Sequence, residues 1–181
     1  NNKDLELLDF ISGQVSLAME RKEKEDKIEN QAATLGAIFD SSTHQIWSID
    51  RKLRFTSFNH NYSEAFKTYF GKEPIVGKSI YDIIDLFSIE VKDFWEKKYE
   101  EAFLGKFVNF QIRTEDKKNR EVWREVFLNP IFLPNGRIEE LSVIANDITE
   151  KKEAEGALIA SEEKFRTIFE SFQDIYFRCN I

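Results

Sequence analysis

The 181-residue chain has few residues suited to redox or metal chemistry. It contains one cysteine, Cys179, and two histidines, His44 and His60. A single cysteine excludes a disulfide framework within the chain and fits a reducing compartment. We therefore expect a cytoplasmic location, and the parent protein could still be membrane-anchored elsewhere. Neither histidine has cysteines or acidic residues at metal-ligand spacing, so no metal site is predicted.

Glycine and proline are also scarce, with 7 and 3 residues. Their combined share is about half the usual one, which predicts long helices and strands with few tight turns. No two glycines are close enough to cradle a phosphate. The sequence therefore gives no indication of a phosphate-binding loop.

The chain lacks a basic surplus and long apolar runs. Its 26 basic residues face 33 acidic ones, and acidic residues outnumber basic ones in residues 1–34, 35–150 and 151–181 alike. This balance argues against nucleic acid as a partner. No apolar run approaches the roughly 20 residues that span a bilayer, and no signal peptide opens the chain, so no membrane contact is expected. In contrast, 17 Phe, 5 Tyr and 3 Trp residues predict a packed aromatic core.

The N-terminal part has the pattern of an amphipathic helix. Apolar residues recur every three or four positions, first at Leu5, Leu8, Ile11, Val15 and Ala18, and again at Ile28, Ala32, Leu35 and Phe39. Eight consecutive charged residues, 20–27, separate the two groups and indicate a solvated stretch. We expect one long helix, or two with a register shift, from about Asp4 to Asp40. A helix of this length implies a neighbour or a dimer partner.

The middle of the chain changes period twice. Residues 45–50 and 53–58 have strand propensity and predict a hairpin. Asn61 and Glu64 predict a capped helix up to Gly71 and Pro74, a short helix follows at 79–84, and Ser88 is expected to cap a helix that ends near Gly105.

Three longer strands are predicted next, at 107–114, 121–132 and 138–148, with a turn at 116–119 and a tight hairpin at Asn135-Gly136. The strand at 121–132 is apolar on both faces, so we expect both faces to be covered. The element order predicts an α+β fold: a five-stranded antiparallel sheet with helices on one face, flanked by long, coiled-coil-like helices.

The C-terminal helix is expected to begin with a reciprocal cap between Asp147 and Glu150. Its apolar seam is Ala154, Leu158, Ser161, Phe165, Ile168 and Phe172. An internal repeat lies here: the residues 38–41 recur as 168–171, and Ile46-Trp47 recurs as Ile175-Tyr176, where a strand is expected to open.

No residues form a catalytic constellation, and Cys179 is interpreted as an incidental thiol. Asp147-Ile148-Thr149 is more specific, because it lies between the last strand and the last helix. It can be a simple helix cap, or it can couple the sheet to the helix. The two interpretations are compatible, and both stay open.

The chain resembles the PAS family of sensory domains. The resemblance rests on the stretch 35–50, on the run 123–136 with Asn129-Pro130 and Asn135-Gly136, and above all on Asp147-Ile148-Thr149-Glu150-Lys151-Lys152, which is similar to the family's C-terminal signature. It implies a PAS domain at 35–150 and a linker helix at 151–160. Residues 161–181 look like the start of a second PAS domain, and residues 1–34 like the end of a GAF domain followed by a charged linker helix.

The resemblance also implies signal-coupling roles for Asp147 and Thr149 and a small-molecule pocket between sheet and helices. From strand parity and helix facing, the predicted lining is Ile46, Phe58, Phe66, Trp95, Phe110 and Val126. Residues 59–105 lack the cysteine of flavin-adduct members, and residues 85–105 lack the histidine common in haem-binding members. We therefore expect neither cofactor, and a filled core without any ligand is the alternative.

Three functions remain in view. The first is a sensory and dimerisation module of a signal-transduction protein, such as a sensor histidine kinase, that forms a homodimer through its flanking helices and contacts adjacent GAF, PAS and output domains. The second is a ligand-free spacer. The third is a small-molecule enzyme, which would need Glu125 buried beside His44 or His60. We expect no catalysis by these residues themselves.

Overall fold

The computed structural model of the chain describes residues 2–83, 89–115 and 120–178. The predicted Ser88 cap, the turn at 116–119 and Cys179 lie outside the described residues. The element order confirms the prediction of a helix, two strands, three helices, three strands and a helix: α1 (Asn2–Ser41), β1 (Gln45–Asp50), β2 (Phe55–Phe58), α2 (His60–Phe70), α3 (Ile80–Ile83), α4 (Ile89–Phe103), β3 (Val108–Glu115), β4 (Glu121–Phe132), β5 (Ile138–Asp147) and α5 (Thr149–Arg178).

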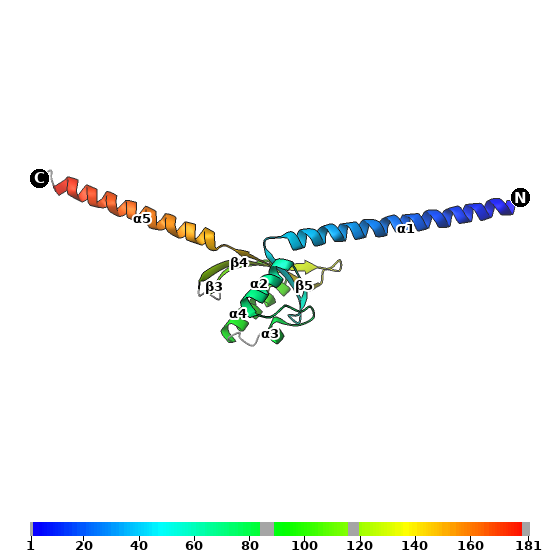
Figure 1. Ribbon diagram of the computed structural model, residues 1–181, viewed down its shortest axis with the longest axis horizontal. Coiled ribbons are helices and arrows are strands. Elements are labelled where there is room, and N and C mark those ends of the chain that lie inside the picture. The colour runs from blue at the N-terminus through cyan, green and yellow to red at the C-terminus, as the bar shows by residue number, and fades with distance from the viewer. Residues whose placement is uncertain (1, 84–88, 116–119, 179–181) are drawn as a thin grey trace. The chain divides into compact units, whose positions relative to one another are not determined.

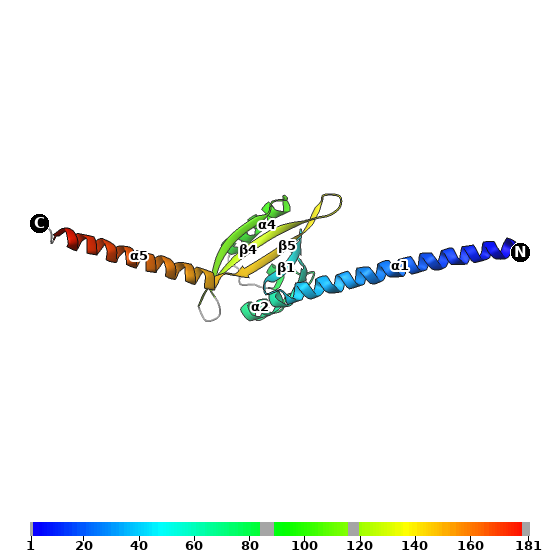
Figure 2. The same cartoon turned by 90° about the horizontal axis from the view of Figure 1, so that it is seen from above.

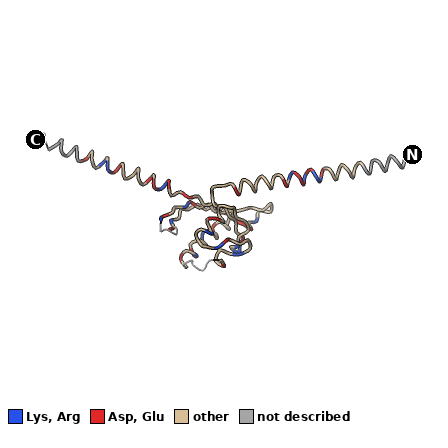
Figure 3. Tube along the Cα trace, in the orientation of Figure 1, with Lys and Arg blue, Asp and Glu red and all other residues tan. Residues whose placement is uncertain are grey.

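The chain divides into two units, residues 1–42 and 43–181. The first unit is α1, a single uninterrupted helix rather than two. Its charged stretch 20–27 is exposed, and Figure 3 shows acidic and basic residues following one another there. A helix that satisfies its own backbone hydrogen bonds tolerates such a polar stretch, so the helix continues through it.

The second unit is built on an antiparallel sheet with the strand order β2-β1-β5-β4-β3. Helices α2, α3 and α4 lie on one face of this sheet (Figure 1), and β1, β5 and β4 run side by side (Figure 2). The five-stranded antiparallel sheet and the helices on one face are confirmed.

The core lies between the sheet and these helices. It is rich in aromatic residues: Trp47 stacks on Tyr62 with ring centres 4.4 Å apart, and Phe66 lies edge-on to Phe55 at 6.0 Å. Leu128 and Val143 from the middle strands are fully buried beneath them. Each such apolar side chain contributes about 1.5–3 kcal/mol by leaving water.

Two predicted turns are confirmed by their glycines. Gly71 ends α2 with a φ of 68°, and Gly136 closes the β4–β5 hairpin with a φ of 79°. Both angles lie in the left-handed region, where a residue without Cβ is favoured.

Three expectations of local structure differ from the structure. Strand β2 begins at Phe55 rather than Leu53, because Leu53 has a φ of 57° and belongs to the turn. Along β4, buried residues alternate with half-buried ones such as Phe127, so the second face is only partly covered within the described residues. The residues Ile175-Tyr176 are helical, since an extended segment needs a neighbouring strand whereas a helix pairs its own backbone.

Within the part of the chain that the structure describes, no helix combines the length and apolar character needed to cross a bilayer.

Candidate functional site: the junction between the sheet and the last helix

Asp147 and Thr149 meet where β5 passes into α5. The Asp147 carboxylate accepts hydrogen bonds from the Thr149 backbone N–H at 2.9 Å and from its hydroxyl at 2.6 Å. The Thr149 hydroxyl oxygen in turn accepts a bond from the backbone N–H of Trp123 at 3.0 Å. A continuous chain of hydrogen bonds therefore joins the start of the helix to β4, the strand next to β5.

A second set of contacts holds the same place. The Ile148 N–H donates to the Trp123 carbonyl at 2.9 Å, so both backbone groups of Trp123 are bound by residues 148 and 149. One helical turn later, the ammonium of Lys152 lies 5.7 Å from the centre of the Trp123 indole ring. A change in the position of β4 at Trp123 must therefore move or break bonds to the first turn of α5.

The cap differs in detail from the predicted one. Asp147 bonds to Thr149, two residues on, instead of pairing reciprocally with Glu150, which is exposed. This is the geometry in which an aspartate side chain closes a local turn onto the backbone ahead of it. The Thr149 hydroxyl donates to Asp147 and accepts from Trp123, so the same atoms close the helix start and connect it to β4. The cap interpretation and the coupling interpretation therefore involve the same hydrogen bonds.

The predicted pocket residues fall on two faces of the sheet. Phe58, Phe66, Trp95, Phe110 and Val126 all belong to the core between sheet and helices or pack against it. Ile46 does not, because it pairs with Ile144 on the face away from the helices, while its neighbours Trp47 and Ile49 point into the core. Ile46 and Trp47 are adjacent and both apolar, so the sequence does not show which of the two side chains points toward the core. The position of Ile46 was predicted wrongly.

The aromatic side chains of this layer lie against one another. Trp95 has its ring centre 5.4 Å from that of Phe110, and 5.6 Å from that of Tyr99. Residues 59–105 contain no cysteine that could form an adduct with a flavin. Whether any ligand binds stays a prediction, and so does the expected absence of both cofactors.

Burial shifts the tyrosines of the core away from acid–base function. The pKa values of Tyr62 and Tyr99 are raised well above 10, mainly because burial penalises the charged phenolate. Electrostatic repulsion from a nearby tyrosine raises each pKa further, from Tyr99 in the case of Tyr62 and from Tyr81 in the case of Tyr99. Burial, and to a smaller extent Glu96, raises the pKa of Tyr81 to about 12. All three phenols are therefore neutral at physiological pH.

The residues required by the enzyme hypothesis are apart. Glu125 is half-buried, and its strand partners are Gln111 and Asn146 on the face away from the helices. His44 and His60 are exposed. Among the described residues there is no group of three or more His, Cys, Asp or Glu side chains that could hold a metal ion.

Asn59 is a structural residue that the sequence reasoning missed. It is fully buried and caps α2, in place of the predicted Asn61. Its side-chain oxygen accepts bonds from the N–H groups of Ile46 at 3.0 Å and Tyr62 at 2.9 Å, and its amide donates to the His44 carbonyl at 2.9 Å. An amide side chain can donate and accept at once, which is why asparagine suits this position. Asn61 instead donates to the Thr43 carbonyl.

Arg124 was also missed. It lies on β4 with its side chain on the core face, two positions before Val126, so the strand parity used for Val126 would have placed it there. Its Nη1 donates to the Thr114 hydroxyl at 2.8 Å, and its guanidinium carbon lies 4.6 Å from the centre of the Tyr69 ring.

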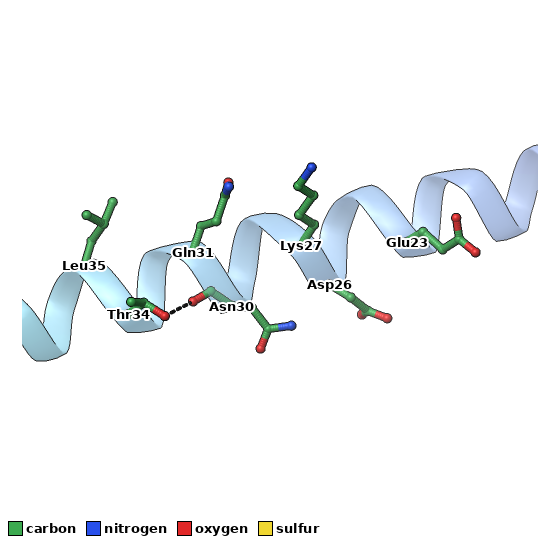
Figure 4. Close-up of a pocket in the computed structure, with 7 residues that line it drawn as sticks. All are labelled: Glu23, Asp26, Lys27, Asn30, Gln31, Thr34 and Leu35. Atoms are coloured by element: carbon green, nitrogen blue, oxygen red, sulfur yellow. Dashed lines mark hydrogen bonds between the residues drawn. The ribbon is translucent and has the colours of Figure 1, made fainter.

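Helix α1 carries a surface depression that is open to solvent. Figure 4 shows that its seven residues, from Glu23 to Leu35, all belong to one helix. Such a surface lacks the opposing wall of a binding pocket. A second shallow recess, lined by Glu121, Trp123, Thr149, Lys152 and Glu153, lies at the junction itself.

Comparisons with known proteins agree with this geometry. The family model described as "PAS domain" matches residues 46–150. Three solved structures share the fold. They are the PAS domain of an HTR-like protein from Haloarcula marismortui (19% identity, TM-score 0.50, 70% of this chain and 99% of that one), a C-terminal domain from Streptococcus mutans (15%, 0.51, 68% and 89%) and an RNA-binding light-oxygen-voltage receptor (15%, 0.53, 73% and 37%).

The chain thus spans 37% of the length of that receptor. A search of curated proteins gives no match. At these identities the solved structures support the fold alone. The assignment to a family rests on the family model.

Proposed function

Because the chain belongs to the PAS domain family, the sensory domains of signalling proteins, we propose that it acts as a sensory and dimerisation module. Its role is to relay a change in the PAS core to the flanking helices. The parent that fits best is a sensor histidine kinase, with the catalytic activity outside these residues. Asp147 and Thr149 are the signal-coupling residues of this proposal.

The observation that carries the proposal is the double attachment of the Trp123 backbone to residues 148 and 149. Trp123 lies in β4, whose alternate residues line the core, and Thr149 is the first residue of α5. A ligand or a neighbouring domain that favours one position of β4 then favours one position of the helix start. The shift is limited to the difference in its interaction free energy with the two states.

The flanking helices support an output through pairing with a second copy. Apolar seam residues of α5, Leu158 and Phe165 among them, are exposed, as are Val15, Ile28 and Leu35 of α1. In aqueous solution, apolar residues at alternating spacings of three and four become buried when a second helix packs on them. A homodimer, with GAF, PAS and output domains adjacent along the chain and a cytoplasmic location, completes the proposal.

A second candidate is a ligand-free spacer that only pairs subunits. The close packing of aromatic side chains in the core favours it over the enzyme hypothesis. It shares the dimer seam with the sensory module and differs in having no ligand response.

The seam can be tested by charge insertion in the full 181-residue chain. The variant Leu158→Lys/Phe165→Lys places two ammonium groups on the seam of α5. Sedimentation velocity is expected to show a dimer for the parent chain and at least a tenfold weaker dimer for the variant, because burying two lysines is unfavourable.

The matched control is Ala160→Lys/Thr167→Lys, which adds the same charges on the opposite side of α5. It should dimerise like the parent chain. Equal dimerisation of the seam variant and the control, or of a chain ending at Thr149, would contradict the role of the exit seam.

A further inference from the structure

The end of the sheet far from the α5 junction carries a group of exposed apolar side chains. Strand β4 leaves the junction near Trp123, and the β4–β5 hairpin that follows extends past α4 (Figure 2). Five large apolar residues around this hairpin have exposed fractions from 39% to 79%: Leu104, Phe107, Ile131, Phe132 and Leu133. Single exposed apolar residues are ordinary, whereas several at one place mark an interaction surface. These five residues are called the apolar end below.

Contacts of Ile138 bring the segments of the apolar end together. Ile138 is the register partner of Phe132, and its Cδ1 lies 3.6 Å from the position that a Cβ would take on Gly105. The Ile138 carbonyl accepts a hydrogen bond from Nε of Arg51 at 2.7 Å. The loop 104–107, the hairpin and the β1–β2 turn therefore lie side by side.

The charges around the apolar end are mostly positive. Five basic residues face three acidic ones in the segments that form it, 50–54, 104–107 and 131–140, although acidic residues prevail in the chain as a whole. Two of the three acidic residues are already paired with arginines of the same segments, Asp50 with Arg54 and Glu139 with Arg137. Lys52 and Lys106 are exposed and form no ion pair within the described residues. This surface is therefore complementary to a negatively charged partner.

The backbone of both loops satisfies most of its own N–H groups. In the hairpin, the Leu133 N–H donates to the Arg137 carbonyl and the Gly136 N–H to the Leu133 carbonyl, each at 2.8 Å, while Pro134 has no N–H. In the other loop, the N–H groups of residues 104–106 donate back to carbonyls at the end of α4. The apolar layer of a membrane offers no hydrogen bonds, so it accepts only backbone that is already paired. Exposed apolar side chains on such loops suit a lipid surface.

We propose that the apolar end binds the surface of an anionic membrane, with its apolar side chains among the headgroups and Lys52 and Lys106 at the lipid phosphates. Lysine side chains can lay their stems on an apolar layer while the ammonium stays at its polar boundary. The expectation of no membrane contact rests on the lack of long apolar runs and concerns spanning segments, whereas a peripheral contact needs only a few apolar side chains and basic neighbours. This inference goes beyond the sensory module and does not depend on it.

The experiment is co-sedimentation of the 181-residue chain with lipid vesicles. The vesicles consist of phosphatidylcholine alone or of phosphatidylcholine with about 30% phosphatidylserine, which supplies the negative surface potential. The chain should bind the anionic vesicles about tenfold or more tightly than the neutral ones. Raising the salt from about 0.1 M to about 1 M should release most of the bound chain, because the Debye length falls from about 10 Å to about 3 Å.

A fluorescent residue at the hairpin distinguishes insertion from adsorption by charge alone. Phe132→Trp places an indole ring on the apolar end. Its added fluorescence should shift to the blue with anionic vesicles, because the ring leaves water for the headgroup region. Fluorescence that does not shift while the chain is bound would contradict the insertion of the apolar end.

A pair of variants with a matched control tests the apolar side chains. Phe132→Ser/Leu133→Ser should weaken binding to anionic vesicles about tenfold or more, because two apolar side chains leave the contact. Ile89→Ser/Val91→Ser makes the same change at two exposed positions at the start of α4, the end of that helix opposite to Leu104. This control should bind like the parent chain.

A second pair of variants tests the charges. Lys52→Gln/Lys106→Gln should weaken binding to anionic vesicles and leave the weak binding to neutral vesicles unchanged. Lys22→Gln/Lys24→Gln alters the net charge equally within the exposed charged stretch of α1 and should bind like the parent chain.

The proposal is overturned if the parent chain does not sediment with anionic vesicles, or if Phe132→Ser/Leu133→Ser binds them as well as its control. It is also overturned if that variant instead loses dimerisation in sedimentation velocity, because the apolar end would then pair two copies of the chain. Vesicle binding and the effect of the α5 seam variants are measured separately, so the failure of one proposal leaves the other standing.

Discussion

Two sets of apolar residues in this chain have opposite environments. Phe55 in the sheet has an exposed fraction of 2%, whereas Phe165 in α5 has one of 62%. The first belongs to a core closed by strands and helices of the same unit, and the second to a helix that carries its apolar seam into solvent. Similar side chains thus stabilise the domain in one region and are available to a partner in the other.

The polar residues follow the same division. In the globular unit, buried side chains such as Asn59 and Ser48 are hydrogen-bonded to strands. In α1, the charged stretch 20–27 interrupts the apolar seam (Figure 3). Hydrogen bonds of buried side chains therefore help to fix the fold of the globular unit. Helix α1 instead alternates between segments with exposed apolar residues and a charged, solvated segment.

The largest difference in stability is expected when a phenylalanine is replaced by alanine in each of the two regions. Phe55→Ala is expected to lower the free energy of unfolding by about 3–5 kcal/mol, because it opens a cavity in the core. Phe165→Ala should change it by less than about 0.5 kcal/mol in the monomer. Urea denaturation followed by tryptophan fluorescence at low protein concentration measures both, and similar losses would refute the division.

A buried polar residue should matter nearly as much as a core ring. Asn59→Ala leaves the Ile46 and Tyr62 N–H groups and the His44 carbonyl without their partner, so we expect a loss of about 2–4 kcal/mol. Asn30→Ala, on an exposed position of α1, should be neutral within about 0.5 kcal/mol. If both variants unfold at the same urea concentration, Asn59 has no special structural role.

The junction should have an intermediate effect that is local. Thr149→Val removes the hydroxyl that donates to Asp147 and accepts from the Trp123 N–H, while the backbone bond from residue 149 to Asp147 can remain. We expect a loss of about 1–2 kcal/mol and faster amide hydrogen exchange in the first turn of α5. Thr167→Val, whose hydroxyl donates to the Glu163 carbonyl in the exposed part of α5, is the control. Unchanged exchange at residues 149–153 in Thr149→Val would show that these bonds do not hold the helix start.

The smallest effect concerns the β1–β2 turn and depends on pH. Burial alone would raise the pKa of Asp50, but hydrogen bonds from Arg54 and from the Lys52 N–H outweigh it and lower the pKa below 3.8. A lowered pKa in the folded state gives stability that is present above the unfolded pKa and lost as the pH falls through the folded value. Asp50→Asn should therefore cost about 1 kcal/mol at pH 7.

That cost should shrink as the pH falls below about 4, where the parent chain protonates Asp50. Thermal unfolding of both proteins between pH 2.5 and 7 measures the difference. A difference that stays constant across this range would exclude a charged role for Asp50.

The regular elements could be predicted because their signals are local. The seams of α1 and α5 and the alternation in β3 to β5 each need only a few neighbouring residues, and Asn135-Gly136 needs only its own backbone freedom. Asp147 and Thr149 were identified in the same way. In contrast, Ile46 was placed on the wrong face, since two adjacent apolar residues leave the parity of a short strand open.

The roles of Asn59 and Trp123 depend on contacts between segments that are distant in the sequence. The role of Asn59 arises only when β1 comes beside the start of α2, thirteen residues away from Ile46. Trp123 reaches Thr149 across the sheet, at a separation of 26 residues. Such bonds leave no periodic trace in the sequence.

The sequence by itself therefore determined the order of elements, the sheet with helices on one face and the apolar seams, because hydrophobic periodicity and turn chemistry act over a few residues. Only the tertiary structure decided which side of β1 faces the core, which asparagine caps α2 and that Arg124 contacts the Tyr69 ring and the Thr114 hydroxyl. These outcomes depend on strand register and on the desolvation of polar groups, and both are properties of the assembled sheet rather than of any one segment.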